Sequence, residues 1–150
     1  MSYERERLTI TNFLQDQNFF DLEDFGLDAD DFEEKANSGF MSILSGQALV
    51  ESISGSKLLV KTTSVLSITF LLEGGKGSSE AKIKAQEIID VLFDKKLDEN
   101  GLLQSNTSDI IIDFGANGFV PYIASLRKEA PFVRTTVNAS FVRTERKTRS

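Results

Sequence analysis

The sequence offers few side chains that could carry out bond chemistry. It contains no cysteine and no histidine, which excludes cysteine nucleophiles, thiolate metal sites and a Ser-His-Asp triad. The usual general base near neutral pH and the commonest metal ligand are therefore both missing. Carboxylates and lysines remain, but nothing selects one pair of carboxylates for glycosidase-like chemistry. We expect a protein that is not an enzyme and that holds no cofactor.

A glycine-rich segment comes closest to a known binding motif. Residues 73–79 read Glu-Gly-Gly-Lys-Gly-Ser-Ser and lie between an expected strand and an expected helix, the usual setting of a phosphate-binding loop. That motif has four residues between its first Gly and a Gly-Lys-Ser/Thr. Here Lys76 is followed by Gly77, and position 70 is Phe. The segment predicts a strand-to-helix connection with a capping serine, and it leaves Lys76 as a candidate contact residue.

The acidic segment 21–34 is a second candidate. It lacks the alternating Asp/Asn series, the central Gly and the correctly spaced Glu of a calcium loop, so no metal site is predicted. A solvated acidic face or a contact with a partner remains. The candidate contact residues in this segment are Asp24, Asp28, Asp30, Asp31 and Glu33.

Charge is divided unevenly along a chain whose net charge is −6. Residues 1–40 contain 11 acids and 3 bases, whereas residues 127–150 contain 7 bases and 2 acids. The negative total argues against a general nucleic-acid binder. The basic candidates are Arg134, Arg143 and Arg146. Two interpretations remain open, a basic end without a role that frays over 145–150, and a contact with the acidic segment of a neighbouring copy.

Two helices and several strands must position these residues. Apolar residues at helical spacing predict a helix over 3–17, within residues 1–20, and a clearer one over 79–93. Alternating patterns and turn residues predict short strands between them and after them. The expected strands are 40–44, 48–53, 57–61, 64–72, 110–114, 119–124 and 132–143.

This order predicts a fold class. A helix, several strands, a helix and several more strands indicate an α+β domain with an antiparallel or mixed β-sheet and two main helices packed on one face. The 150 residues correspond to one domain over 1–150. No apolar run is long enough to span a bilayer, so we expect a protein made in a cytosol that does not enter a membrane.

Two parts of the sequence resemble a known family. The strand 64–72, the turn Gly74-Gly-Lys-Gly77 and the helix that ends in Ile88-Ile-Asp-Val-Leu-Phe93 are similar to the core of the tail-terminator (tail-completion) proteins of long-tailed bacteriophages. Those proteins end in a strand with a Phe-Arg-x-Glu-like signature, which Phe141-Val-Arg143-Thr-Glu145 resembles. The resemblance covers mainly residues 64–94 and 132–146.

The resemblance implies a structural function. Members of the family form a hexameric ring on the end of the tail tube, stop its polymerisation and provide the docking surface for the head connector. It implies as partners other copies of the chain, the tail tube protein and the head-tail connector or neck protein. Viral DNA would pass through the lumen without specific binding, and the protein would be located in the tail or neck of the virion after synthesis in the bacterial cytoplasm.

Two hypotheses assign roles to the charges. The acidic front and the basic end would form complementary faces between adjacent subunits of the ring, or acidic residues would face the lumen and repel DNA. The alternative functions are a head-completion or minor tail protein and, more distantly, a small enzyme that uses carboxylates or Lys76.

Overall fold

A computed structural model describes residues 2–17, 25–26, 36–74, 77–103 and 109–148 of the chain. Within these ranges the elements follow in the order helix, strands, helix, strands. The helices are α1 (Ser2–Gln17), α2 (Gly77–Leu92) and the 3-10 turn η3 (Ala116–Gly118). The strands are β1 (Phe25–Gly26), β2 (Ser38–Ser54), β3 (Lys57–Glu73), β4 (Lys96–Asp98), β5 (Gly101–Leu102), β6 (Ile110–Asp113), β7 (Tyr122–Glu129) and β8 (Phe132–Thr148).

The described strands form one eight-stranded sheet, in which seven follow the order β1-β2-β3-β8-β6-β4-β5 and the eighth, β7, pairs with β8. Strands β2 and β3 form a long hairpin, and β3 pairs with β8 over its whole length, from Lys57 opposite Thr148 to Glu73 opposite Phe132. On its other side, β8 pairs with β7 along its first half and with β6 near its end. All pairings are antiparallel except the parallel contact of β1 with β2.

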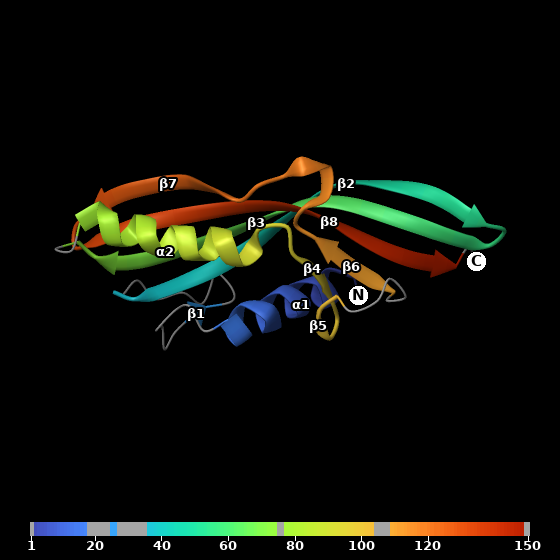
Figure 1. Ribbon diagram of the computed structural model, residues 1–150, viewed down its shortest axis with the longest axis horizontal. Coiled ribbons are helices and arrows are strands. Elements are labelled where there is room, and N and C mark those ends of the chain that lie inside the picture. Colours follow the sequence, from blue (N-terminus) through green and yellow to red (C-terminus); the bar gives the residue numbers. More distant parts are fainter. Residues whose placement is uncertain (1, 18–24, 27–35, 75–76, 104–108, 149–150) are drawn as a thin grey trace.

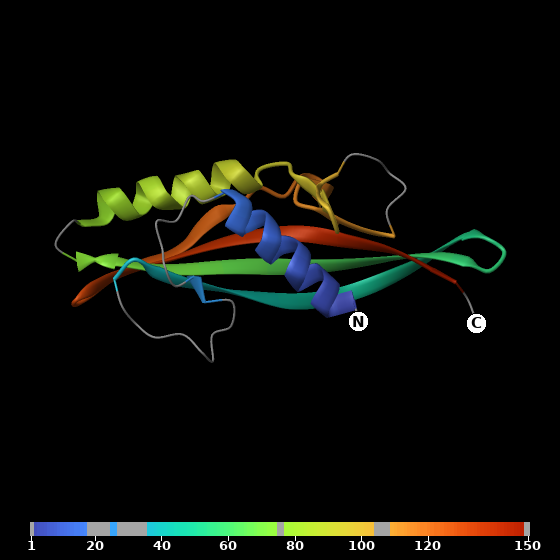
Figure 2. The same ribbon diagram turned by 90° about the horizontal axis from the view of Figure 1, so that it is seen from below.

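Both long helices pack on one face of this sheet, and the core lies between them (Figures 1 and 2). Because side chains alternate between the faces of a strand, β3 and β8 each contribute every second residue to this core. The core residues of α1, α2, β3 and β8 are Ile10, Phe13, Leu14, Ala81, Ala85, Ile88, Leu92, Leu66, Ile68, Phe70, Leu72, Val133, Val137, Ala139 and Phe141. The predicted α+β domain, with two helices on one face of a mixed sheet, is confirmed.

The opposite face of the sheet is polar along its central strands. The hydroxyl of Ser67 donates to the side-chain oxygen of Asn138 at 2.8 Å, and the hydroxyls of Thr69 and Thr136 lie 3.0 Å apart. These side chains pair across β3 and β8, so the strands that fill the core with one face present hydroxyl and amide groups on the other. The alternation predicted for residues 132–141 is therefore observed.

The hairpin differs from the predicted short strands. The sequence predicts separate strands on either side of Gly46 and of residues 62–63, but β2 and β3 are continuous strands of 17 residues each. A shift of register between Ser45 and Ala48 absorbs the interruption at Gly46 as a bulge. A Cβ atom on Gly46 would lie 2.5 Å from the carbonyl oxygen of Thr63, so glycine allows the two backbones to approach closely at this point.

The frayed tail predicted for residues 145–150 is wrong for residues 145–148. Strand β8 continues to Thr148, and the side chain of Glu145 is only 4% exposed. The physical reason is pairing on both sides, because Lys57–Val60 of β3 run beside the end of β8 and β6 lies across from Val142–Glu145. The helix predicted within residues 1–20 is observed over Ser2–Gln17.

Candidate assembly surface

The sheet extends past the helices as a three-stranded arm (Figures 1 and 2). We define the arm as residues 48–54 of β2, 57–62 of β3 and 143–148 of β8, which pair with one another in that order. Gly55, at a positive φ of 50°, makes the tight turn that joins β2 to β3 at the tip. The arm therefore owes its reach to the uninterrupted pairing of β3 with β8 and to the hairpin that joins β3 to β2.

The arm exposes large apolar side chains on β2. Leu49 is 64% exposed, Val50 is 60% exposed and Ile53 is 52% exposed, and Leu44 just before the bulge is 75% exposed. Leu49 and Val50 are adjacent in a strand, so they point to opposite faces of the arm. Each face of the arm therefore carries exposed apolar side chains that a partner surface could remove from water.

The base of the arm is joined to α1 by a buried ionic cluster. Nη1 of Arg143 lies 2.6 Å from Oε2 of Glu6, and Nε of Arg143 lies 3.0 Å from Oε1 of Glu145. A second guanidinium nitrogen donates to the hydroxyl of Thr62 at 3.4 Å. Glu6 is fully buried and Arg143 is 9% exposed, so the cluster is removed from water.

The carboxylates of Glu6 and Glu145 share the one guanidinium group of Arg143, so the three buried side chains carry more negative than positive charge when all are ionised. Burial raises the pKa of Glu6, and the attraction of Arg143 only partly opposes that rise. Lys147, whose Nζ lies 3.6 Å from Oε2 of Glu145, adds a second cation that is largely exposed. Arg143 is consequently committed within the chain and holds α1 against β8.

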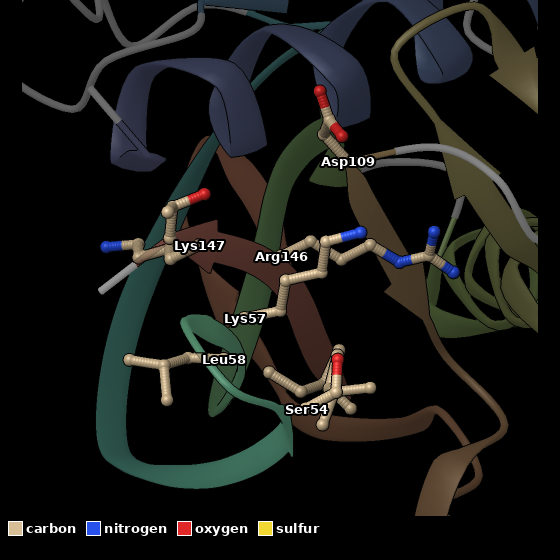
Figure 3. A pocket seen from close by; sticks show the side chains of 9 residues that line it. Ser54, Lys57, Leu58, Asp109, Arg146 and Lys147 are labelled. Atoms are coloured by element: carbon tan, nitrogen blue, oxygen red, sulfur yellow. The ribbon is translucent and has the colours of Figure 1, made fainter. Parts of the chain in front are cut away.

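The tip of the arm carries a shallow cleft of about 680 Å³ (Figure 3). It is lined by Ile53, Ser54, Lys57, Leu58, Leu59, Asp109, Arg146, Lys147 and Thr148. Lys57 and Arg146 extend to one side of the strands and Lys147 points to the other. The cleft brings together basic, apolar and hydroxyl side chains and the carboxylate of Asp109.

The three predicted arginines occupy three different environments. Arg134 lies near the start of β8, with its Nε 3.2 Å from Oε2 of Glu129, and Arg146 lies on the exposed arm. Twelve residues of extended strand separate them by about 40 Å, and Arg143 is buried between them. They do not form one basic patch, and Arg143 is not a surface contact. The other predicted contact residues, Asp24, Asp28, Asp30, Asp31, Glu33 and Lys76, lie outside the described residues.

Sequence reasoning missed the two features that define this surface. The burial of Glu6 against Arg143 left no local signal, because the two residues lie 137 positions apart in the sequence. The exposed residues of β2 were expected to be ordinary strand residues. A signal was nevertheless present, because β2 combines seven large apolar side chains with a single charge, Glu51.

The described residues show no sign of a metal or membrane site. They contain no group of three or more acidic, histidine or cysteine side chains arranged to hold a metal ion. In the same residues, neither long helix has the length and apolar character that crossing a membrane requires.

No protein-family model and no curated protein matches the chain.

Proposed function

We propose that this chain is a structural assembly protein of long-tailed bacteriophages, a tail terminator that caps the end of the tail tube as a homo-hexameric ring. The observation that carries the proposal is the projecting arm, whose exposed Leu49, Val50 and Ile53 need a partner surface to be removed from water. The ring stops tube polymerisation and presents a docking surface for the head connector, while DNA passes through its lumen. Binding and shape perform this function, without bond chemistry.

Three observations support the proposal. The sequence contains no histidine and no cysteine, so its composition favours a binding function. The strand and helix that carry the resemblance, residues 64–94, are β3 and α2, which pack together in the core. The Phe141-to-Glu145 signature supplies a core phenylalanine and both β8 members of the ionic cluster at the base of the arm.

The residues of the Phe141-to-Glu145 signature have identifiable structural roles. Phe141 fills the core beneath α1, and its ring packs against Phe114 with 5.1 Å between the centroids. Arg143 and Glu145, two and four residues later, face the same side of β8 and fix α1 at the point where the arm begins. The signature thus joins the core to the ionic contact between β8 and α1 at the base of the arm.

The positions of the arginines restrict which of them could pair with acidic residues of an adjacent subunit. Arg143 is excluded from a contact between subunits because it is buried beside Glu6. Arg146, on the arm, and Arg134, near the opposite end of β8, remain candidates for separate contacts with acidic residues of neighbours. Each of these contacts would lie at the solvent-exposed rim of an interface. It would therefore influence the rate and the specificity of association more than the affinity.

The test is electron microscopy of lysates of a phage in which this gene is disrupted. Overlong tubes detached from filled heads are the expected result, because loss of the ring leaves polymerisation unchecked. Tails of normal length beside leaking or unjoined heads would contradict the terminator function and favour a head-completion protein. Fully normal particles would overturn a structural role in the virion.

A complementation series sharpens this experiment. The wild-type gene and an Ile83→Lys variant should restore normal tail length, because Ile83 is 61% exposed on α2, away from the arm. A variant with lysine at both Leu49 and Val50 should fail to restore it. Equal rescue by all three genes would contradict the role that we assign to the arm.

A further inference from the structure

The sheet has two substantial edges that no described strand covers. One is the outer edge of β2, where β1 lies beside Gly39 and Phe40 and no described strand lies beside residues 41–54. The other is the outer edge of β7, whose described pairing is with β8 alone. Every strand edge carries a row of unpaired backbone N–H and C=O groups and can accept another strand.

The edge of β2 lacks the features that normally prevent such pairing. Proteins protect edges with lysine, proline, short strands or bulges. Strand β2 is 17 residues long, contains no lysine, arginine or proline, and has Glu51 as its single charge. Bulges near Gly46 and near Ser52 are its main protection, and the large apolar side chains of the arm flank that edge. A monomer with this edge exposed would be prone to association.

The edge of β7 has complementary properties. Tyr122 and Ile123 at its start are 55% and 36% exposed, and Arg127 and Lys128 near its end are exposed bases. The single charge of β2 is acidic, so two such edges brought together do not repel each other. Exposed apolar side chains also occur on both strands, at the start of β7 and along the arm part of β2.

The directions of the strands permit the two edges to join. Successive pairings from β2 through β3 and β8 to β7 are all antiparallel, so β7 runs opposite to β2 within one molecule. When a second copy is placed beside the first in the same orientation, its β7 is therefore antiparallel to the β2 that it meets. The eight residues of β7 fit within the open stretch of β2.

We propose that β7 of one copy adds to the open edge of β2 of the next copy, so that the subunits associate head to tail through a shared antiparallel sheet. A contact between two different surfaces repeats from copy to copy and closes into a ring when the rotation permits. The inference deepens the proposed function, on which the closure into a ring rests. The pairing itself depends only on the two edges.

The chain contains no cysteine, so introduced thiols report contacts without background. The experiment uses three single-cysteine variants of the full chain, Val50→Cys on β2, Ile123→Cys on β7 and Ile83→Cys on α2 as the matched control. Residues on neighbouring strands have Cβ atoms about 5 Å apart when directly opposite and 7–8 Å apart diagonally. The proposal places Ile123 of one copy opposite or diagonal to Val50 of the next, the register in which β7 covers the exposed apolar part of β2, and a short thiol-specific crosslinker spans these separations.

The variants are mixed in pairs, with one member of each pair carrying a tag so that mixed products are identified by mass. The expected result is a mixed product of Val50→Cys with Ile123→Cys that exceeds every product of Ile83→Cys. A dominant product of Val50→Cys with itself would overturn the head-to-tail arrangement, since it would indicate two β2 edges related by a twofold axis. No product above the control would also overturn the proposal.

A second measurement uses association of the uncrosslinked protein. Lysine at both Leu49 and Val50 should weaken self-association roughly tenfold or more, because charged edge residues oppose strand pairing. Ile83→Lys should leave it unchanged. Sedimentation and native mass spectrometry give the oligomeric state, and circular dichroism verifies the fold. Unweakened association of the double variant would overturn the proposal.

The two proposals fail in different ways. One outcome is that copies crosslink between β2 and β7 while disruption of the gene leaves tails normal. This outcome would support the strand pairing and refute the terminator function. Overlong tails on disruption, together with no crosslink between these strands, would preserve the function and refute the pairing.

Discussion

Replacement of Arg143 by methionine tests the ionic cluster at the base of the arm. Methionine has a similar length but no charge, so it leaves Glu6 and Glu145 buried without their shared cation. These two carboxylates are 0% and 4% exposed, and water cannot replace the guanidinium without opening the contact of α1 with β8. The loss of one partner from a buried pair costs about 3–5 kcal/mol of the free energy of unfolding.

This magnitude is large for a domain of 150 residues. Typical free energies of unfolding are about 5–15 kcal/mol, so the variant should lose a considerable fraction of its stability. A change of 1 kcal/mol shifts the melting temperature by about 2–4 °C at this size. We therefore expect the melting temperature of Arg143→Met to fall by roughly 6–20 °C.

The assay is urea unfolding followed by far-ultraviolet circular dichroism, because the chain contains no tryptophan. The matched control is Arg134→Met, in the same strand, whose ion pair with Glu129 is partly exposed and should contribute less than about 1 kcal/mol. Adding Glu6→Gln to Arg143→Met should recover part of the loss, since one uncompensated carboxylate is removed. Equal losses for the two methionine variants would refute the reasoning.

Three further predictions concern single positions. Because burial raises the pKa of Glu6, its protonated form stabilises the fold, and this contribution is lost as the pH rises through the raised pKa. In urea titrations the stability of the wild type minus that of Glu6→Gln should therefore fall as the pH rises above the ordinary pKa of a glutamate, and a constant difference would contradict the assignment. Phe141→Ala should lower the free energy of unfolding by about 3–5 kcal/mol. Phe93→Ala, at a side chain that is 53% exposed, should change it by no more than about 0.5 kcal/mol, and thermal unfolding of both variants measures the difference. Gly46→Ala should destabilise the hairpin by about 1–3 kcal/mol, because its Cβ would meet the carbonyl oxygen of Thr63, and a stabilised variant in the same assay would disprove this close approach.

The helices and the alternating strands were predictable because their signals are local. The helical spacing of apolar residues in α1 and α2, and the alternation in β8, each lie within one element. The turn at Gly55 is likewise encoded locally, in the three consecutive residues Ser54-Gly55-Ser56. Packing then followed from the apolar faces, and the α+β class was confirmed.

The continuity of the hairpin was not predictable from the same signals. Gly46 interrupts the apolar pattern of β2, and Thr62 and Thr63 interrupt that of β3, so each strand was divided in two. The continuity comes from β8, which pairs with β3 at every position from Lys57 to Glu73. A partner that follows much later in the sequence leaves no trace in a local pattern.

The candidate site was the least predictable part for a related reason. Composition singled out the basic end, but it could not distinguish Arg143, which is buried, from Arg146, which is exposed. The burial of Arg143 depends on Glu6 of α1, and the tail predicted to fray is held by β3 and β6. The charges of residues 143–148 indicated solvent exposure for the whole segment. Strand pairing and ion pairs with distant parts of the chain determine which of these side chains are buried.

The central position of β8 has a consequence for how the chain acquires its structure. Strands β3, β6 and β7 all pair with β8, and yet β8 is the last of them to leave the ribosome. A nascent chain that ends before Phe132 therefore exposes three strand edges and the apolar faces of both helices. Contacts between distant parts of a sequence form slowly, and such intermediates are prone to aggregation. During synthesis this protein should depend on chaperones until its final strand has emerged.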